Sequence, residues 1–335
     1  MHSTSQAATT GATINRRTLL GAAATLLGTG ASLQAAQWPS RTVSLLVGFG
    51  AGGVLDVLVR ILAEELRQDT RQPFVVENRP GASGMLAAGL VARAEPDGHT
   101  LLAMSGTITI APALMKDLQI DVRRDLTPIT LFATSPNILV VRPDFPAGTV
   151  PEFVAAIRAK PAGEFAYATS GRGTTVHFMA GMLEQATAIA MRHVPFRSSA
   201  DSIRAVISGE LPIAFSSVNS ALPFIAAGQV RAIGVAGSAR SNFVPGTETF
   251  KEAGIEGVAS DTWFGLAGGA RLDPAMVETI HARCSAAIRK PGIRERLATL
   301  GAVPLDMTPS ATKAQFDREI DDFARLAARM NLTAE

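Results

Sequence analysis

Cysteine, aromatic side chains and charge are all scarce in this sequence. The single cysteine, Cys284, excludes a disulfide within the chain, so the cellular compartment has to be inferred from another feature. Aromatic residues make up 5% and charged residues 18% of the chain, whereas hydrophobic residues make up 47%. This balance excludes an intrinsically disordered chain and allows a sizeable core. The length of 335 residues predicts two domains or one large domain.

Long apolar runs and an excess of one charge are also missing after residue 37. No segment there has 18 uninterrupted apolar residues, so we expect the mature protein to be soluble. Taking Arg16 and Arg17 away with residues 1–37 reduces the 31 Lys and Arg residues to 29, which equals the 29 Asp and Glu residues. No basic stripe is present, and we therefore predict no nucleic-acid partner.

Residues 1–37 predict an export signal that is removed from the mature protein. A polar lead is followed by Arg16 and Arg17, the apolar run Leu19–Leu27, and a cleavage region close to Leu33–Gln37. The paired arginines favour the twin-arginine route, although the flanking residues depart from the usual form and leave an ordinary secretory signal open. We therefore predict that the mature protein is periplasmic.

Strand-like and helix-like patterns alternate along the rest of the chain. Residues 42–49, TVSLLVGF, predict a strand, and Val54–Leu66 has apolar residues on one helical face. Separate strands are predicted at 126–133 and 137–143, and Thr149 is the expected N-cap of the next helix. Such alternation predicts parallel sheets covered on both faces, in two α/β lobes, with ligands beyond the carboxyl ends of the strands.

Two glycine loops occupy strand-to-helix turns. The first is GFGAGGVLD, residues 48–56, and the second is TSGRGTTVH, residues 169–177. Small residues at the start of a helix leave backbone N–H groups unpaired, and the helix dipole is positive there, so such loops bind phosphate or carboxylate. Glycines that only permit tight turns and close packing are the alternative.

The first loop also has the spacing of a dinucleotide-binding fingerprint. Gly48, Gly50 and Gly53 follow the pattern G-x-G-x-x-G, and Glu77 lies 24 residues beyond Gly53 at the end of an apolar run. An exported NAD(P)-dependent oxidoreductase is therefore an alternative function. Asp56, in the first turn of the following helix, argues against it, because its carboxylate would cap the amides and repel a pyrophosphate.

Motifs for catalysis or metal binding are absent from the sequence. There is neither a G-x-S-x-G nor an H-E-x-x-H motif, and the histidines have no metal-ligand spacing. His177 either donates to a ligand at the second loop or tucks under that loop. Cys284 and Trp263 are predicted core residues, with a cleft wall as the alternative for Trp263. We predict no catalytic residue, no metal and no cofactor.

From about Trp38 to the C-terminus, the sequence resembles the Bug-type substrate-binding proteins of tripartite tricarboxylate transporters. The resemblance rests on the segments ENRPGASG, ARAEPDGHTLL and YATSGRGTTVHFMAG, together with the AGG-x-x-D loop. It implies a type II periplasmic-binding-protein fold, in which two α/β lobes are joined by two crossing strands. The crossings would fall near Asn137–Val141 and Asp261–Phe264. Lobe one would comprise residues 38–138 plus 262–335, and lobe two residues 139–261.

The resemblance also implies a ligand site between the lobes. Carried onto this sequence, the expected ligand-binding residues of the two loops are Phe49, Ala51, Gly52, Gly53, Asp56, Ser170, Gly171, Gly173, Thr174 and Thr175. Leu55 and His177 are added from the same loops, and Ser105, Thr107, Ser216 and Ser217 from other strand ends. Leu55 stands where the family often has a small or hydroxyl residue. The hypothesis is therefore a carboxylate with an apolar or aromatic portion.

The function implied by the resemblance is that of an extracytoplasmic receptor and not of an enzyme. Its partners would be a small organic carboxylate and the integral-membrane permease of a tripartite transporter, and we expect a monomer. Besides the oxidoreductase, a ligand sensor that docks on a histidine-kinase ectodomain is an open alternative. The pocket would be the same in a sensor, so the sequence does not discriminate between them.

Overall fold

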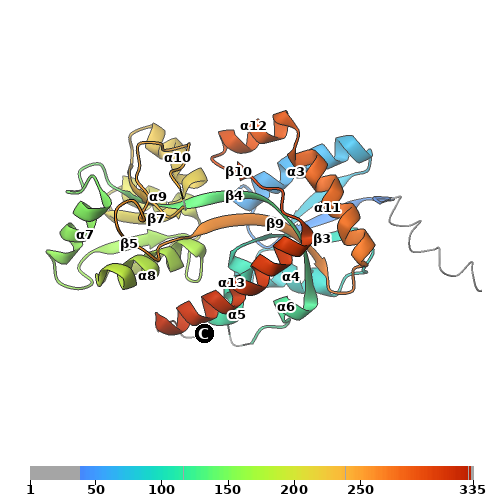
Figure 1. The fold of residues 1–335 in the computed structure, drawn as a ribbon, viewed down its shortest axis with the longest axis horizontal. Coiled ribbons are helices and arrows are strands. Elements are labelled where there is room, and N and C mark those ends of the chain that lie inside the picture. Colours follow the sequence, from blue (N-terminus) through green and yellow to red (C-terminus); the bar gives the residue numbers. More distant parts are fainter. Residues whose placement is uncertain (1–37, 116, 238, 331, 333–335) are drawn as a thin grey trace, which may run out of the picture. The chain divides into compact units, whose positions relative to one another are not determined.

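The computed structural model describes residues 38–115, 117–237, 239–330 and 332. All elements named below lie in one compact unit, Pro39–Glu335 (Figure 1). The predicted export signal, residues 1–37, lies outside the described residues.

Strands and helices alternate as the sequence predicts. The strands are β1 Val43–Val47, β2 Phe74–Asn78, β3 Thr100–Ser105, β4 Leu126–Val141, β5 Ala166–Thr169, β6 Arg192–Pro195, β7 Ile213–Ser217, β8 Arg231–Val235, β9 Asp261–Gly269 and β10 Val303–Pro304. The helices are α3 Val54–Thr70, the 3-10 turn η1 Ala82–Gly84, α4 Met85–Ala92, α5 Thr107–Leu114, α6 Val122–Asp125, α7 Val150–Arg158, α8 Thr175–Thr187, α9 Ser199–Ile207, α10 Val218–Ala226, α11 Pro274–Ile288, α12 Pro291–Thr299 and α13 Pro309–Arg329.

The strands follow the hydrogen-bonded path β2-β1-β3-β9-β4-β7-β5-β6, and β10 and β8 also pair with β4. The first lobe contains β2, β1, β3, β9, β10 and the first part of β4, and the second lobe contains the rest of β4 with β7, β8, β5 and β6. Pairing is parallel among β2, β1 and β3 and among β6, β5 and β7, but antiparallel wherever β4 or β9 takes part. Each lobe thus contains the predicted parallel strands, and the two crossing strands add antiparallel pairs that the strand–helix alternation alone did not predict.

Strand β4 passes from one lobe to the other without interruption. It pairs with β9 from Leu126 to Pro136 and with β7 from Asn137 to Val141. The sequence predicted two separate strands here, because Ser135 and Pro136 interrupt the apolar pattern. Pro136 is tolerated since it lies where β4 changes partners and a ladder hydrogen bond is not required.

A partly buried polar network lies where the two strands cross. The Asn137 side chain donates to Ser260 Oγ at 2.8 Å and accepts from Thr262 Oγ1 at 2.9 Å. Thr262 Oγ1 in turn lies 2.6 Å from Thr175 Oγ1 at the start of α8. Asn137 is fully buried, and its side chain therefore ties both strands to the first turn of a helix in the second lobe.

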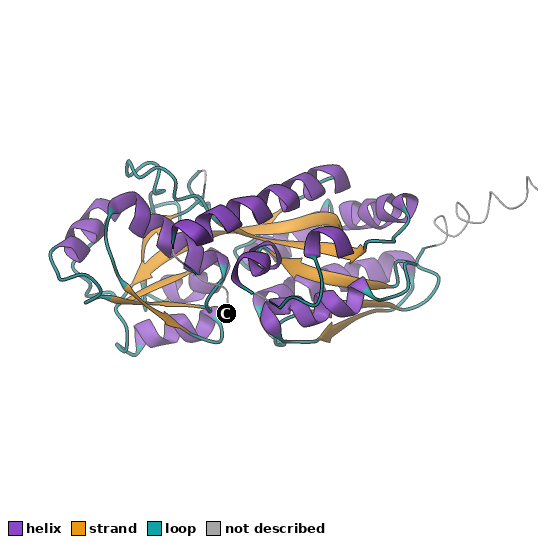
Figure 2. Ribbon diagram, turned by 90° about the horizontal axis from the view of Figure 1, so that it is seen from below, coloured by secondary structure: helices purple, strands orange, loops and turns teal. Residues whose placement is uncertain are grey.

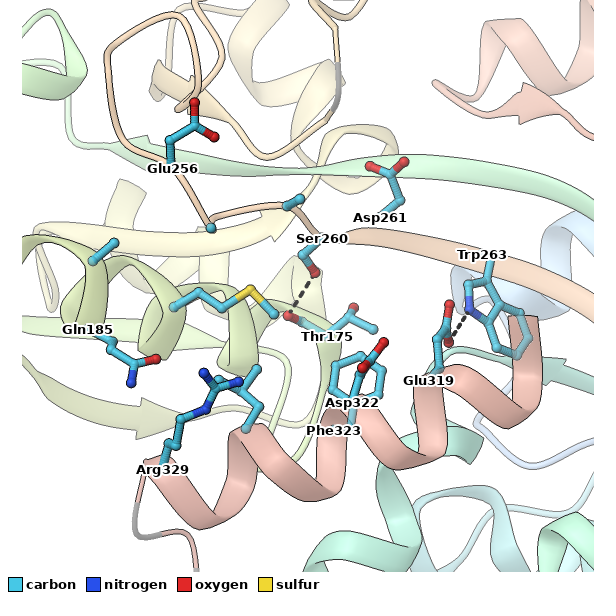
Figure 3. A pocket seen from close by; sticks show the side chains of 15 residues that line it. Thr175, Gln185, Glu256, Ser260, Asp261, Trp263, Glu319, Asp322, Phe323 and Arg329 are labelled. Carbon is cyan, nitrogen blue, oxygen red and sulfur yellow. Dashed lines mark hydrogen bonds between the residues drawn. The ribbon is translucent and has the colours of Figure 1, made fainter. Parts of the chain in front are cut away.

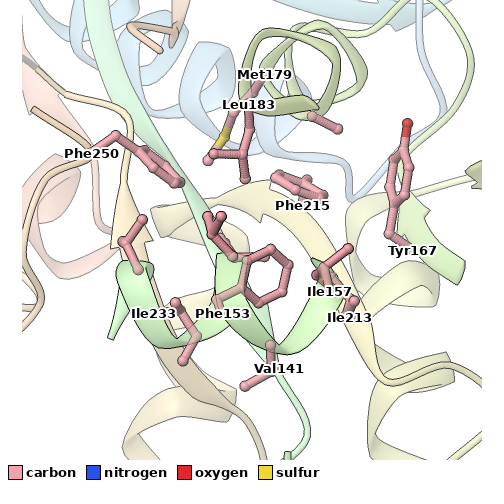
Figure 4. Packing of buried hydrophobic residues seen from close by; sticks show 14 of the residues in the cluster. Val141, Phe153, Ile157, Tyr167, Met179, Leu183, Ile213, Phe215, Ile233 and Phe250 are labelled. Atoms are coloured by element: carbon pink, nitrogen blue, oxygen red, sulfur yellow. The ribbon is translucent and has the colours of Figure 1, made fainter. Parts of the chain in front are cut away.

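Each lobe has its own apolar core. In the second lobe, Phe153, Phe215 and Phe250 are buried together with residues of α8 on one face of the sheet (Figure 4). In the first lobe, residues of β3, α4, β9 and α13 form the corresponding cluster. Cys284 is fully buried, which confirms its core assignment. Trp263 is 3% exposed and belongs to the first-lobe core, but it also lines the large cavity described below, so it has both of the roles weighed for it.

Helix α13 runs alongside the crossing strands and contacts both lobes (Figures 1 and 2). Phe316 packs in the first-lobe core, whereas Leu326 and Ala327 share a cluster with Phe178 of α8. A Cβ placed on Gly181 of α8 would collide with Met330. The predicted lobe boundaries, 38–138 with 262–335 and 139–261, remain a prediction, and the end of α13 packs on the second lobe.

Candidate functional site

The first glycine loop joins β1 to α3. Gly53 is the N-cap of α3 and has no side-chain capping bond, so Asp56 does not occupy the N-cap. Asp56 instead accepts the Gly52 N–H at 2.9 Å from its place in the first helical turn. A Cβ on Gly50 or Gly52 would meet no atom within 4 Å, so this part of the loop borders open space.

Asp56 is the centre of a hydrogen-bonded cluster beneath the first loop. It is 3% exposed and accepts from Asn78 Nδ2 at 2.9 Å and from Arg60 Nε at 3.1 Å. Asn78 Nδ2 also donates to the Phe49 carbonyl at 3.1 Å. Burial raises the pKa of Asp56, but the bonds from Arg60, Gly52 and Asn78 outweigh it and hold the pKa below its ordinary value. The carboxylate is therefore ionised at neutral pH.

A second turn packs behind the first loop, and sequence reasoning did not include it in the site. Gly48 approaches Gly84 so closely that a Cβ on Gly48 would collide with the Gly84 backbone. Ala82 and Ser83 adopt φ angles of 47° and 53°, which are strained for residues other than glycine. The glycines of RPGASG are the signal that could have identified this turn.

A small cavity lies between that turn and the strand ends. Phe49, Ser83, Gly84 and Ser105 are among its lining residues, and its volume of about 10 Å³ is near that of one water site. The structure thus brings two predicted ligand residues, Phe49 and Ser105, to one place. Both belong to the first lobe.

The second glycine loop joins β5 to α8. Thr174 is the N-cap of α8: its Oγ1 accepts the His177 N–H at 3.4 Å and donates to the Gly171 carbonyl at 2.8 Å. The Gly173 N–H donates to His177 Nδ1 at 3.1 Å. These bonds use the Thr174 hydroxyl and the Gly173 amide to shape the loop, so neither is an unpaired donor for a ligand.

His177 lies beneath the second loop and stacks on His193. The ring centroids are 4.0 Å apart, and His193 Nε2 lies 2.7 Å from Thr169 Oγ1. Burial, followed by His193 and Arg172, lowers the pKa of His177 to about 3. Burial and Arg172 lower the pKa of His193 to about 4. Both rings are therefore neutral at pH 7, and because Nδ1 of His177 is an acceptor, its proton is on Nε2.

The remaining predicted residues fall into two groups. Thr175 lies beside the crossing strand β9, because its Oγ1 is 2.6 Å from Thr262 Oγ1. Thr107 is close by, because a Cβ on the preceding Gly106 would be 3.1 Å from Thr175 Cγ2. Ser216 and Ser217 lie at the end of β7; Ser217 Oγ contacts Ser220 Oγ at 3.1 Å. Ser216 Oγ is buried and has no partner among the described residues.

Leu55 and Ser170 differ in accessibility. Leu55 is 5% exposed, so its side chain is packed within the protein and does not line either described cavity. Ser170 is half-buried at the start of the second loop. A ligand can therefore reach the backbone of the loops more readily than the Leu55 side chain.

A cavity of about 490 Å³ lies elsewhere, between α8, the segment before β9 and α13 (Figure 3). Thr175 is the one predicted ligand residue that lines it. Its lining includes four carboxyl groups and one guanidinium, that of Arg329. Burial raises the pKa of Asp261 and of Glu319, and the other two carboxyl groups belong to Glu256 and Asp322. This excess of negative charge disfavours an anion, so the glycine loops and not this cavity are suited to a carboxylate.

The described residues contain neither a metal-binding cluster nor a membrane-spanning helix. Within them, no group of three or more His, Cys, Asp or Glu side chains is arranged to hold a metal ion. Among the same residues, no helix is long and apolar enough to cross a membrane. Glu77, which the dinucleotide fingerprint required for a ribose, forms an ion pair with Arg79 at 2.8 Å.

Comparison with known proteins gives matches over most of the chain. A family model described as tripartite tricarboxylate transporter family receptor matches residues 58–331. Protein BugT of Bordetella pertussis is 28% identical over 299 residues, which cover 89% of this chain and 91% of that protein.

Solved structures agree with the sequence comparison. A structure of an R. palustris protein with adipate has a TM-score of 0.83 and 26% identity and covers 89% of this chain and 100% of that one. MatC from Rhodopseudomonas palustris with bound malate has a TM-score of 0.77 and 29% identity and covers 86% and 99%. With the two lobes and crossing strands, these similarities confirm the predicted type II periplasmic-binding-protein fold.

Proposed function

The chain belongs to the tripartite tricarboxylate transporter receptor family, and on this premise we propose that it binds a small organic carboxylate between its lobes. It then delivers this ligand to the integral-membrane permease of a tripartite transporter. The proposed location is the periplasm, and the proposed working form is a monomer. Binding and release, without chemical conversion of the ligand, are the whole of the proposed activity.

The observation that carries this proposal is the pair of glycine loops. One comes from each lobe, and each lies between the carboxyl end of a parallel strand and the start of a helix. Among the described residues, the Gly50 and Ala51 amides of the first loop have no acceptor within the protein. Amides at such places stabilise an anion without a titratable side chain. Relatives of the same fold solved with adipate and with malate support a carboxylate as that anion.

The proposed ligand contacts are mainly backbone groups. They belong to Phe49, Ala51, Gly52, Gly53, Leu55 and Asp56 of the first loop, Ser170, Gly171, Gly173, Thr174, Thr175 and His177 of the second, and the strand ends Ser105, Thr107, Ser216 and Ser217. An apolar portion of the ligand would face the half-buried Phe49 ring. Because Asp56 is ionised beneath the first loop, a pyrophosphate there would be repelled, which disfavours the oxidoreductase.

Ligand capture would use the crossing strands as a hinge. A ligand that contacts both loops binds best when the lobes approach each other, so it shifts the population toward the closed arrangement. The network around Asn137 and Thr262 links the crossing to the start of α8, where the second loop ends. Movement of the lobes and occupancy of the loop are thereby coupled.

A thermal-shift screen tests the proposed function. Purified protein is heated with a panel of organic acids and with the primary amide of each acid as the matched control. We expect at least one acid to raise the Tm by several degrees and its amide to leave it unchanged, because only a carboxylate gains from the loop amides. Stabilisation by neutral compounds alone would contradict the proposal.

A further inference from the structure

The middle of helix α13 is attached to the first lobe by directional polar bonds. Glu319 Oε2 accepts the Trp263 Nε1–H at 2.7 Å and the Thr109 hydroxyl at 3.1 Å. The Arg123 guanidinium of α6 donates to the Asp321 carboxylate at 2.6 Å. Such bonds depend on distance and angle, and their partners belong to β9, α5 and α6. This part of α13 therefore moves with the first lobe.

The last turns of α13 are attached to the second lobe by apolar contacts instead. The Phe323 ring packs edge-on against Phe178 of α8, with the ring centroids 5.1 Å apart. Met330 fills the space beside Gly181, where an added Cβ would collide with the Met330 Cε. Among the described residues, no hydrogen bond or ion pair joins α13 to α8. Apolar contacts have no fixed direction, so these two helices can slide past each other when the lobes move.

The arrangement of the lobes in the structure leaves the first glycine loop uncovered. Residues 50–53 are exposed, and a Cβ on Gly50 or Gly52 would meet no atom within 4 Å. A ligand held between the lobes needs the second lobe to approach this loop. The structure therefore shows the open arrangement, and the contact between the end of α13 and α8 belongs to it.

Closure has to disturb this contact because of the place where α8 is tied to the crossing strands. Thr175 Oγ1 lies 2.6 Å from Thr262 Oγ1, and the Thr175 carbonyl accepts from Ser260 Oγ at 3.3 Å. Phe178 and Gly181 lie about one and two turns further along α8. A rotation about the crossing therefore displaces them more than it displaces Thr175. The cavity of about 490 Å³ between α8 and α13 leaves space for this displacement (Figure 3).

We propose that residues 323–330 of α13 form a strap that holds the two lobes open, and that its contact with α8 sets the fraction of molecules in the closed arrangement. The apparent affinity for a ligand is reduced by the fraction that is not competent to bind. The strap thus weakens binding without touching the ligand, since none of its residues is among the proposed ligand contacts. This inference rests on the proposed function and adds how binding at that site is regulated.

Two alanine variants remove the strap contacts, and a third is their matched control. Met330→Ala and Phe323→Ala each remove a contact with α8, whereas Ile320→Ala shortens a side chain of the same helix that packs on the first-lobe core. Calorimetric titration uses the first of adipate, malate or benzoate that the unsubstituted protein binds. We expect binding tighter by about threefold or more in the strap variants and changed by less than about twofold in the control.

The outcome that overturns the strap is equally specific. Circular dichroism and Tm measurements identify the variants that fold, and Met330→Ala decides the matter if Phe323→Ala does not. Unchanged or weaker binding in the folded strap variants, or an equal gain in Ile320→Ala, would overturn the inference. Failure of the unsubstituted protein to bind any carboxylate is a different result, since it would refute the proposed function itself.

A disulfide across the contact tests the opposite direction. An added Cβ at Gly181 would lie 3.4 Å from Met330 Cγ, so Gly181→Cys combined with Met330→Cys places two thiols within reach of each other. Cys284 is fully buried and stays out of the reaction. With the bond confirmed by mass spectrometry, we expect the oxidised protein to bind about tenfold more weakly than the same protein after reduction. Equal affinities before and after reduction would overturn the strap.

Discussion

The two glycine loops have the same plan, but they are supported by opposite means. Beneath the first loop, an ionised Asp56 accepts hydrogen bonds from the Gly52 amide, from Asn78 and from a half-exposed Arg60. Beneath the second, neutral imidazoles are stacked in the protein interior. The comparison therefore teaches that the support of a loop, as much as its glycines, determines what it can hold.

Removing the acceptor of the first loop should have the largest effect on stability. Asp56→Ala removes the carboxylate that accepts from the Gly52 N–H, Asn78 Nδ2 and Arg60 Nε, and because these bonds are charge-assisted we expect a loss of about 3 kcal/mol in the free energy of unfolding. Asp56→Asn is the matched control, because it keeps an oxygen for the Gly52 amide and should cost less. Urea denaturation measures both. A loss below about 1 kcal/mol for Asp56→Ala would show that the cluster does not hold the loop.

Alanine substitutions at equivalent glycines of the two loops should lower the unfolding free energy by different amounts, because the loops differ in packing. Gly52 and Gly173 have φ angles of 78° and 72°, so alanine is strained at either. At Gly173 the added Cβ would also lie 2.6 Å from Leu114 Cδ1, whereas Gly52 borders open space. We expect unfolding free energies lower by about 2 kcal/mol for Gly173→Ala and about 1 kcal/mol for Gly52→Ala. The reverse order in urea denaturation would mean that Leu114 of α5 does not pack tightly against Gly173 of the second loop.

Acid should destabilise the support of the second loop. The folded pKa values of His177 and His193 are lowered to about 3 and about 4, so below the ordinary histidine value of 6.5 the unfolded chain binds protons that the folded protein does not. Their stabilisation is thus complete above pH 6.5 and is lost as the pH falls toward 4. The charged groups nearby are Arg172, which lowers both pKa values, and Glu184, which faces Tyr167.

The size of this acid effect follows from the number of protons. Each histidine contributes a fall of about 1.4 kcal/mol per pH unit in the unfolding free energy below pH 6. Urea denaturation between pH 7 and pH 5 should therefore show a slope that is smaller by about this amount in His177→Asn. Identical slopes in the two proteins would mean that His177 titrates normally in the folded state.

The smallest effect is expected from the exposed end of the first cluster. Arg60 pairs with Asp56 at 2.9 Å, but its side chain is 48% exposed. Arg60→Gln should lower the unfolding free energy by about 0.5 kcal/mol, because water replaces much of the interaction. A loss above about 2 kcal/mol would indicate that the Arg60 guanidinium, and not Asn78, holds Asp56 in place.

The order of strands and helices was predictable from the sequence because apolar periodicity and glycine turns mark each element. Thr149 is the N-cap of α7, as expected, and accepts the Glu152 N–H at 3.3 Å. The continuity of β4 was not predictable, since Ser135 and Pro136 look like a break unless the change of partner is known. The packing of the α13 end on α8 was equally hidden, because it joins segments distant in the chain.

For the site, the sequence located both loops but not what supports them. The glycine patterns and the Asp56 position are local signals. Asn78, which bridges the Phe49 carbonyl and Asp56, lies 29 and 22 residues away from them and has no local signal. The stack of His177 on His193 likewise depends on the parallel pairing of β5 with β6, which brings His193 beside Tyr167 and close to the loop.

The most direct test of the carboxylate receptor is calorimetric titration of the purified protein with an organic acid and with the primary amide of the same acid. The best acid from the thermal-shift screen is the ligand, and the two compounds differ only in charge. We predict binding of one acid per protein chain and no measurable heat with the amide. Equal binding of the amide, or no binding by any acid of the panel, would contradict the account.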